Sequence, residues 1–311
     1  MRKTANIIVV GSHAPGLLMR VERIPLAGET VIGWDFQELV DGGKGSNQAI
    51  AAARLGAQVS FIGCVGQDRL GDEAESWMRQ AGVDTDYLFR SVSTATGVGF
   101  IILSAEGVPL MVTSMGANAE LTEKNVADAL SQFDNGKVLL TQFEIRPAVA
   151  LYATKIGHEQ GMLTILNPAP FADVSLSEFK NCDILVPNET EAMGMLGIDP
   201  SQKTRKPTEL ADELRQRCQI RCVMVTIGEA GVAVSDENGC VQILPPAVQV
   251  VDTSGAGDAF CAALAVGLAN GQMLRDSAKW ACKVAALSVT RPGTILAYPT
   301  LTETEAFTNT M

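Results

Sequence analysis

The chain has 311 residues, of which 47% are hydrophobic and 19% are charged, and these proportions are typical of a globular protein with a sizeable core rather than of a disordered one. Its formal net charge of -11 argues against nucleic acid or an anionic membrane as the main partner, because both bind to basic surfaces. We therefore expect the substrate to be a small molecule.

The cysteines and the apolar segments indicate where the protein works. Seven cysteines are scattered along the chain without a CxxC pair, which is typical of buried thiols in a reducing compartment. The apolar run near the N-terminus is interrupted by GSHAPG at 11–16, before the apolar region of a signal peptide would be complete. No segment approaches the roughly 20 apolar residues of a transmembrane helix. We expect a cytoplasmic protein without a membrane partner.

The first predicted element is a strand over 5–11, because its continuous β-branched run is typical of a strand buried on both faces. Residues 12–41 carry only short apolar stretches, with strand character at 30–32. A helix over 44–56, which stops at a glycine, is followed by a strand over 58–66.

Further along the chain, a helix is predicted near 71–80, and 97–114 is interpreted as two strands around a turn at Glu106 and Gly107. Beyond this hairpin, helices and strands alternate. The predicted helices lie at 121–132, 147–159, 188–196, 207–217, 257–269 and 274–290, and the predicted strands at 137–143, 162–166, 183–186, 221–227, 231–235 and 240–244.

This alternation predicts an α/β protein with a central, mostly parallel sheet flanked by helices on both faces. The strands within 12–41 and 97–114 do not fit the alternation, so we expect them to form a small separate sheet, a β-lid, beside the main one. No repeat, low-complexity tract or linker divides the chain, and 1–311 is predicted to be a single domain with the lid strands inserted.

The stretch VDTSGAGDAF at 251–260 joins a predicted strand to a predicted helix. In open α/β sheets, ligands bind beyond the carboxyl ends of the strands, and a glycine-rich helix start offers free N–H groups to an anion. Asp258 is unusual there, because its carboxylate competes with an anion for the same positive end. Two interpretations stay open: an acidic first helical turn, or a general base that takes a hydroxyl proton while the amides hold a phosphoryl group.

A second glycine-rich helix start, DGGKGSN at 41–47, lacks the spacing of a P-loop, and no GxGxxG follows the first strand. Lys44 is unfavourable for the helix dipole, which suggests that something anionic or hydroxyl-rich compensates its charge, and Asn47 shares its face. The alternative is a solvated lysine and an ordinary asparagine at a helix start. Glu144, after another strand, either faces a substrate or is a solvated loop acid.

The segment that follows the strand at 183–186 offers a third candidate. Asn188 and Glu191 have the spacing of a capping box, or they order hydrated Mg²⁺ and phosphate oxygens. After the strand that ends near Thr226, Gly228 and Gly231 either form a plain turn or admit a flat adenine ring.

Taken together, nine ordered motifs resemble the ribokinase or PfkB family of carbohydrate kinases, and the lysine within GGKG resembles its ribokinase and deoxyribokinase branch. The resemblance implies a ribokinase-like fold and transfer of the ATP γ-phosphoryl group to a primary hydroxyl of a pentose or similar small sugar. The motifs are GS near the start, PLAGETV at 25–31, DGGKGSNQAIAA at 41–52, GANAELT at 116–122, LNPAP at 166–170, PNETEA at 187–192, TIGEAGV at 226–232, VDTSGAGDAF at 251–260 and SVTRPGT at 288–294.

The resemblance also implies residue roles. Asp258 would be the catalytic base, with the amides of Gly255, Ala256 and Gly257 as the anion hole. The sugar would contact Gly43, Lys44, Asn47, Glu144 and Asp258. The nucleotide would contact Asn188, Thr226, Gly228, Gly231, Gly257 and Cys282. Asn188 and Glu191 would bind Mg²⁺ through water, and a K⁺ site would comprise Asp252, Ser254, Ser288, Arg291 and Gly293.

One departure from the family leaves the acceptor open. Family members commonly have G-S-x-N-x-D after the first strand, whereas Ala14 and Gly16 stand here in place of the Asn and Asp that hold sugar hydroxyls. Losing two such hydrogen bonds weakens ribose binding by about ten- to a thousand-fold. Deoxyribose, a nucleoside, fructose or a keto-deoxy sugar acid are alternative acceptors, and a catalytically inactive sugar-binding protein is a further alternative. The resemblance also implies a homodimer through the lid.

Overall fold

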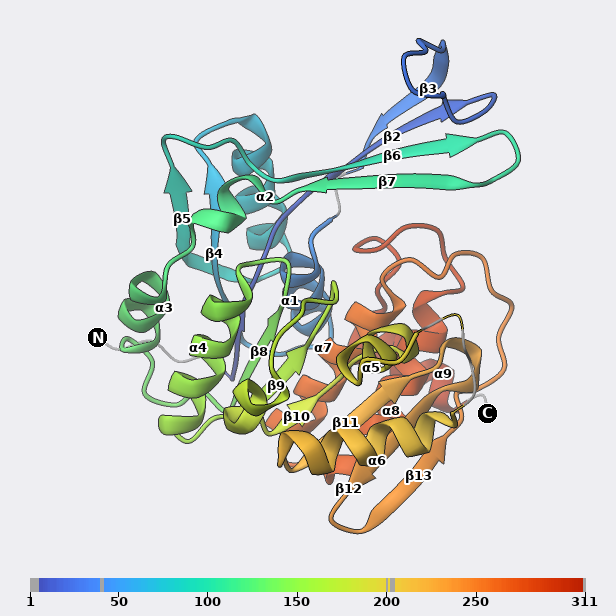
Figure 1. Ribbon diagram of the computed structural model, residues 1–311. Coiled ribbons are helices and arrows are strands. Elements are labelled where there is room, and N and C mark those ends of the chain that lie inside the picture. The colour runs from blue at the N-terminus through green and yellow to red at the C-terminus, as the bar shows by residue number, and fades with distance from the viewer. Residues whose placement is uncertain (1–5, 40–41, 200, 202–204, 310–311) are drawn as a thin grey trace.

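The computed structural model describes residues 6–39, 42–199, 201 and 205–309. Its main feature is a 9-stranded sheet in the order β13-β12-β11-β10-β9-β8-β1-β4-β5 (Figure 1). The pairs from β5 to β11 are parallel, and β11, β12 and β13 pair antiparallel. The strands are β1 (Ile7–Val10), β4 (Val59–Gly66), β5 (Asp84–Ser91), β8 (Val138–Gln142), β9 (Leu163–Asn167), β10 (Ile184–Leu185), β11 (Cys222–Thr226), β12 (Val232–Asp236) and β13 (Gly239–Ile243).

Helices cover both faces of this sheet, as predicted, and strand β1 shows why. Its side chains alternate between two buried apolar clusters: Ile7 and Val9 pack with α1, α2, α7 and α8, whereas Ile8 and Val10 pack with α3 to α6. A strand buried on both faces needs an apolar residue at every position. The helices are α1 (Lys44–Arg54), α2 (Arg69–Gln80), α3 (Glu123–Leu130), α4 (Pro147–Glu159), α5 (Glu189–Met195), α6 (Pro207–Cys218), α7 (Ala256–Ala269), α8 (Leu274–Ser288) and α9 (Leu301–Asn309).

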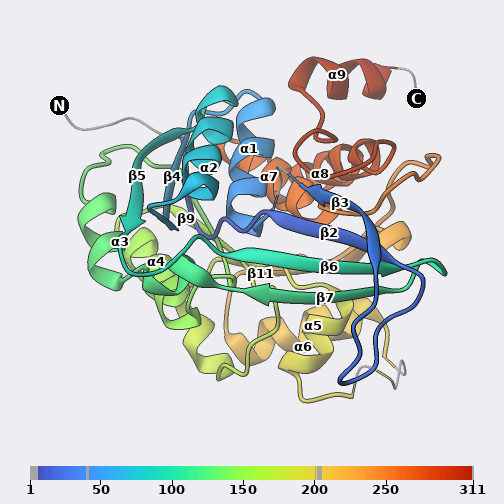
Figure 2. The same ribbon diagram turned by 90° about the horizontal axis from the view of Figure 1, so that it is seen from above.

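A 4-stranded sheet in the order β3-β2-β6-β7 projects from the body (Figures 1 and 2). We call this sheet the lid. It combines strands from the two regions that did not fit the alternation, with β2 parallel to β6 in its centre. Its strands are β2 (Gly16–Val21), β3 (Gly33–Glu38), β6 (Val98–Ser104) and β7 (Pro109–Ser114). Because β2 follows β1 after a short segment, the lid is attached to the main sheet at β1, the third strand from the β5 edge.

One local prediction is wrong, and one strand and one helix were not predicted. The strand expected at 30–32 is wrong, because these residues lie outside any strand and Ile32 is 92% exposed. The lid strands lie instead on either side, at 16–21 and 33–38. Strand β5 and helix α9 were not predicted. The burial of β5 alternates irregularly along DTDYLFRS, as expected of an edge strand, so it lacks a clear period.

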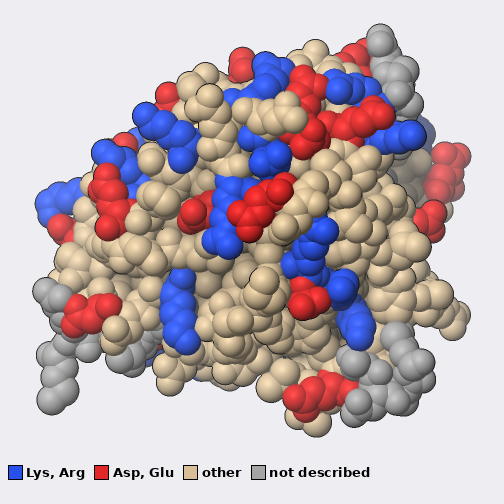
Figure 3. Space-filling model, turned by 90° about the horizontal axis from the view of Figure 1, so that it is seen from below, with Lys and Arg blue, Asp and Glu red and all other residues tan. Residues whose placement is uncertain are grey.

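The distribution of charged side chains and the burial of the cysteines are those expected of a globular protein with reduced thiols. Basic and acidic side chains are interspersed on the face seen from below (Figure 3). Of the seven free cysteines, only Cys240 is exposed, so the prediction of buried thiols holds for the other six. Within the described ranges, no helix is both long enough and apolar enough to span a lipid bilayer.

Candidate active site

The glycines before α1 and in its first turn allow this turn to lie directly on the segment that follows β1. A Cβ on Gly42 would lie 1.9 Å from the carbonyl oxygen of Ala14, and one on Gly45 would lie 2.5 Å from the backbone nitrogen of Ser12. Gly43 has a φ of 84°, in the left-handed region that favours glycine. The predicted sugar-binding motif is therefore built around a backbone contact that only glycine permits.

Carboxylates surround Lys44 at the start of α1. The Glu144 Oε2 atom accepts hydrogen bonds from the Lys44 backbone N–H and from Ser12 Oγ, both at 2.7 Å. Burial lowers the pKa of the Lys44 ammonium, but the charges of Asp258, Glu144 and Glu191 outweigh burial and raise it. Four residues that the sequence assigned to one site thus lie within electrostatic reach of one another, and the anion expected beside Lys44 is provided by the protein itself.

Asp258 lies in the first turn of α7 and is only 4% exposed. Asn47 Nδ2 donates to its Oδ2 atom at 3.1 Å, and Gln48 Nε2 donates to its Oδ1 atom at 2.9 Å. The Asn47 Oδ1 atom is buried and accepts no hydrogen bond from the described part of the protein. A buried acceptor of this kind is costly to leave unpaired, so it suits a hydroxyl of a bound ligand.

The N-terminus of α7 provides free backbone amides beside Asp258. The helix has no side-chain cap, and Gly255 precedes it with a φ of 71°. The Ala256 N–H donates to the Thr253 carbonyl at 3.3 Å, whereas the Gly255 and Gly257 amides donate to no residue in the described ranges. Two of the three predicted anion-hole amides are therefore available, and both lie at the positive end of a helix dipole.

The capping-box interpretation of the segment at α5 is confirmed. Asn188 Oδ1 accepts from the Glu191 N–H and Glu191 Oε2 accepts from the Asn188 N–H, both at 2.8 Å. Asn188 also forms an isolated parallel bridge with Thr226, so these two predicted nucleotide residues are neighbours. Glu191 is 8% exposed, and burial raises the pKa of its carboxyl group against the opposing effects of the Asn188 N–H and Lys44.

The capping box leaves part of this pair free for a cation. Glu191 uses only Oε2 in the box, so its other oxygen can bind a water of a hydrated Mg²⁺ ion. Among the described residues, no group of three or more His, Cys, Asp or Glu side chains is placed to hold a metal ion. The donors present therefore fit contact through water better than a complete protein cage.

The remaining predicted nucleotide residues have different surroundings. Gly231 has a φ of 84°, and a Cβ there would lie 2.0 Å from the Ile243 carbonyl oxygen, so the fold itself requires this glycine. A Cβ on Gly228 would meet no atom within 4 Å, which leaves an open side at the end of β11. Cys282 is 4% exposed within the apolar cluster of α7 and α8, and burial raises the pKa of its thiol to about 12.

Asp252 joins the two loops of the predicted K⁺ site. Its Oδ1 accepts from the Ser254 N–H and its Oδ2 from the Gly293 N–H, both at 2.9 Å. Although burial alone raises the pKa of this carboxyl group, the hydrogen bonds lower it. Ser288 Oγ donates to the Ala285 carbonyl and the Arg291 guanidinium donates to Glu303, and the predicted site would use the main-chain carbonyls of these two residues.

Sequence reasoning missed the role of His13 and Asn118 in shaping the site. The Asn118 side chain accepts from the His13 N–H at 2.9 Å and donates to its carbonyl at 2.8 Å, which fixes the segment after β1. The His13 ring lies 3.0 Å from Ser46 Oγ, and burial lowers its pKa to about 4. The motif GANAELT contained Asn118, but its partner is 105 residues away and could not be identified from spacing.

The position of Gly16 has apolar surroundings. A Cβ there would lie 3.0 Å from Leu39 Cδ1 and 3.5 Å from Ile101 Cδ1. Ala14, the other departure from the family pattern, is 9% exposed. The position of Gly16 is therefore lined by hydrocarbon, and Ala14 is a buried methyl group without a polar atom to offer a sugar.

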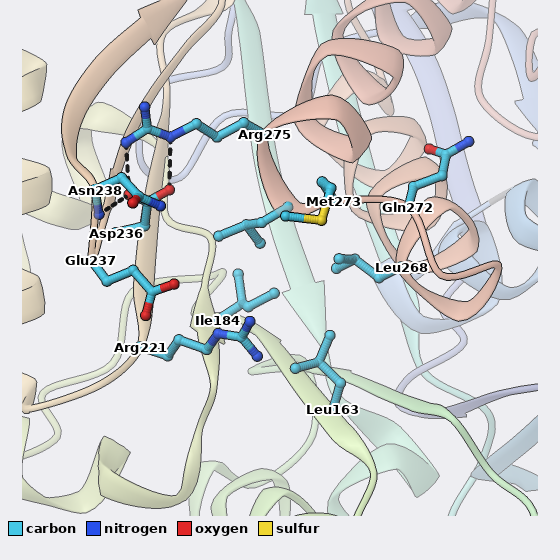
Figure 4. A pocket seen from close by; sticks show the side chains of 11 residues that line it. Leu163, Ile184, Arg221, Asp236, Glu237, Asn238, Leu268, Gln272, Met273 and Arg275 are labelled. Carbon is cyan, nitrogen blue, oxygen red and sulfur yellow. Dashed lines mark hydrogen bonds and ion pairs between the residues drawn. The ribbon is translucent and has the colours of Figure 1, made fainter.

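A pocket of about 220 Å³ lies at the opposite edge of the main sheet (Figure 4). Leu163 and Ile184, the first residues of β9 and β10, line it next to the ion pair between Arg275 and Asp236, whose atoms are 2.7 Å apart. None of the predicted site residues lines this pocket. The candidate site lies instead beyond the carboxyl ends of the parallel strands.

Comparisons with known proteins cover almost the whole chain. The family model described as pfkB family carbohydrate kinase matches residues 4–301. A ribokinase from Schizosaccharomyces pombe is 34% identical, covering 98% of this chain and 98% of the relative, and one from Bacillus subtilis is 37% identical, covering 96% and 98%. The structure of Arabidopsis thaliana ribokinase complexed with ribose and ATP has a TM-score of 0.88 at 27% identity, covering 98% of this chain and 99% of that one.

These matches agree with the nine ordered motifs and with the predicted fold, a large mostly parallel sheet with helices and a separate small sheet. The chain belongs to the pfkB family of carbohydrate kinases.

Proposed function

We propose that the protein is an ATP-dependent sugar kinase that transfers the γ-phosphoryl group to a primary hydroxyl of a pentose or similar small sugar. The observation that carries this proposal is the position of Asp258. Its buried carboxylate is held by Asn47 and Gln48 and adjoins the free amides at the start of α7. The ribokinase from Arabidopsis thaliana, which bound ribose and ATP, has the same overall fold.

In this mechanism, the hydroxyl oxygen of the acceptor forms a bond to the γ-phosphorus of ATP, and the bond between the γ-phosphorus and the oxygen that leaves with ADP breaks. Asp258 accepts the proton of the acceptor hydroxyl. The amides of Gly255 and Gly257 donate to the transferring phosphoryl group, and Lys44 contributes positive charge. Because phosphoryl transfer is loose, little charge develops on the nucleophile early, so a carboxylate can take the proton late. Positioning and the anion hole supply most of the rate.

The proposed reaction also uses Mg²⁺ and K⁺. When bound, Mg²⁺ would neutralise charge on the β- and γ-phosphate oxygens. The free oxygen of Glu191 would hold one of its waters, and Asn188 lies beside it through the capping box. A K⁺ ion would contact carbonyl oxygens in the two loops that Asp252 ties together, and would order the approach to the anion hole.

The acceptor follows from the segment after β1. Lys44, Asn47 and Glu144 provide polar groups for hydroxyls, whereas Ala14 and Gly16 provide none. We therefore expect weak binding of ribose relative to an acceptor that needs no contact there, such as a deoxy sugar or another of the alternatives above. The buried Asp258 and the free amides are what catalysis requires, which weighs against an inactive sugar-binding protein.

We also propose that two copies of the chain form a homodimer through the lid, and that the protein works in the cytoplasm. Strand register places Leu17, Phe100 and Val112 in one row of the lid. Phe100 is 50% exposed and Val112 60%. Such a contiguous apolar surface favours burial against a partner.

An acceptor panel tests the proposed function. Release of ADP is followed in a coupled assay with ATP, Mg²⁺ and ribose, deoxyribose, fructose, a nucleoside or a keto-deoxy sugar acid, with and without K⁺. We expect acceptor-dependent ADP release with at least one sugar and stimulation by K⁺. Sugar binding without ADP release for every acceptor would favour the inactive binding protein.

A further inference from the structure

A row of buried side-chain amides lies behind Asp258. Gln48 on α1 and Gln142 at the end of β8 are both 0% exposed, and Asn167 at the end of β9 is 9% exposed. Gln142 and Asn167 are partners in the parallel register of β8 and β9. Burying polar amides costs free energy unless they are bonded, so their hydrogen bonds indicate what they are for.

Gln48 connects this row to Asp258. Its Nε2 atom donates to Asp258 Oδ1 at 2.9 Å and, more weakly, to Asn167 Oδ1 at 3.4 Å. Its Oε1 atom accepts from Gln142 Nε2 at 2.5 Å. The amide of Gln48 is thus held on both sides, and it reaches the carboxylate that the proposed mechanism uses.

A single backbone carbonyl fixes the orientation of these amides. Asn167 Nδ2 donates to the Val186 carbonyl at 2.8 Å, and because a carbonyl can only accept, the oxygen of Asn167 must point the other way. That oxygen faces Gln48, which must therefore present its NH₂ group to Asn167 and Asp258 and its oxygen to Gln142. A flipped Gln48 would place an oxygen against the carboxylate of Asp258.

Gln142, at the end of the row, packs against the backbone at Gly11. A Cβ on Gly11 would lie 2.3 Å from Gln142 Oε1, so glycine leaves the space that this side chain occupies. Within the described ranges, Gln142 Oε1 accepts no hydrogen bond. The side chain therefore keeps one costly unpaired atom while its NH₂ group is committed to Gln48.

We propose that Gln48 is a positioning residue for phosphoryl transfer: it holds Asp258 in the orientation that receives the acceptor proton, while Gln142 and Asn167 fix its amide. The proposal rests on the role of Asp258 as the base. Because Gln48 is fully buried, it acts through Asp258 and contacts neither substrate. Its loss should therefore lower kcat and leave both KM values nearly unchanged.

A double-mutant cycle tests this role, with ATP and the best acceptor of the panel of ribose, deoxyribose, fructose, a nucleoside and a keto-deoxy sugar acid as the probe substrates. Gln48→Met retains the length of the side chain and removes the donor. In the otherwise unchanged enzyme, we expect kcat to fall about ten- to a hundred-fold, as for loss of a hydrogen bond to a charged group, with both KM values within about three-fold. In the Asp258→Ala background, the same substitution should change the residual kcat by less than about two-fold, because interacting residues are not additive.

Gln132→Met, at an exposed position after α3, is the matched control and should behave like the unsubstituted enzyme. If Gln48→Met does not fold, as judged by its melting temperature and ADP binding, Gln142→Met replaces it in the same cycle, with an expected loss in kcat of about three- to ten-fold. An unchanged kcat in the glutamine variant that folds, or equal losses in both backgrounds, would overturn the positioning role. An unchanged kcat in Asp258→Ala would instead overturn the base assignment, so the two failures are distinct.

Discussion

The carboxylate of Glu144 accepts a hydrogen bond from the backbone N–H of Lys44 at 2.7 Å, across 100 residues of sequence. Helix α1 has no side-chain cap of its own, so Glu144, in the turn after β8, satisfies one of the free N–H groups at the start of α1. The same carboxylate oxygen holds Ser12. Glu144 thus joins the segment after β1, the start of α1 and the loop after β8 at the proposed sugar site.

Replacing Glu144 with alanine should weaken this junction. We expect the free energy of unfolding in urea to fall by about 1–2 kcal/mol, because a helix N-terminus and a serine hydroxyl lose their acceptor. The KM for the sugar should rise more than kcat falls. Glu144→Gln, which keeps an acceptor oxygen, should lose less than half as much stability, and equal losses in the two variants would argue against the hydrogen-bonded junction.

The glycine at 231 should be required by the fold independently of any nucleotide. Gly231 and Gly239 both have left-handed φ angles, 84° and 91°, but a Cβ meets the Ile243 carbonyl at 2.0 Å only at Gly231. In urea unfolding, Gly239→Ala should cost about 1 kcal/mol from backbone strain, and Gly231→Ala about 1–3 kcal/mol more from the clash. A smaller loss at Gly231 than at Gly239 would contradict the packing argument.

Acid should destabilise the protein partly through His13. Burial lowers the pKa of this histidine from 6.5 to about 4, so between these values the unfolded chain binds a proton that the folded chain does not. Stability is therefore lost as the pH falls from about 6.5 to about 4, and none of this loss occurs above 6.5.

Comparison with His13→Gln isolates this contribution, because the carboxyl groups are common to both proteins. Between pH 7 and pH 5, the unsubstituted protein should lose about 2 kcal/mol more than the variant in the free energy of unfolding. Parallel pH curves for the two proteins would mean that His13 is not held neutral by burial.

The proposed dimer predicts that a charge in the lid separates the subunits. Phe100 is 50% exposed in the centre of the lid surface, and Phe100→Glu should shift the sedimentation coefficient from that of a dimer to that of a monomer, since a buried unpaired charge is costly. Val92→Glu, at an 86% exposed position outside the lid, should leave the dimer intact. A monomeric unsubstituted protein would exclude the proposed assembly.

The main sheet could be predicted because its signals are local. The buried run Ile7–Val10 and the start of α4 at Pro147 are readable from a few neighbouring residues. In the lid, the hairpin predicted at 97–114 is confirmed as β6 and β7. The strands within 12–41 were misplaced because Arg20 and Asp35 interrupt their apolar pattern, and these two residues pair with each other at 3.0 Å only in the folded sheet.

The site could be predicted only in outline. Asp258 and Lys44 belong to motifs that a short segment displays, whereas Gln48 reaches Asp258 across 210 residues and Gln142 across 94. No spacing rule identifies such contacts. The capping box at Asn188 is a local feature, and its interpretation from spacing is correct. The metal role proposed for Asn188 and Glu191 depends instead on the atoms that the box leaves free.

The central claim is that Asp258 takes the proton of the acceptor hydroxyl. Its most direct test is the acceptor-dependent kcat of Asp258→Asn, measured as ADP release with the best acceptor of the panel, together with the affinity for ADP and the melting temperature. We expect kcat to fall by about 10²- to 10⁴-fold, the range for a general base, with ADP affinity and melting temperature close to those of the unsubstituted protein. A kcat within about two-fold of the unsubstituted enzyme would contradict the claim.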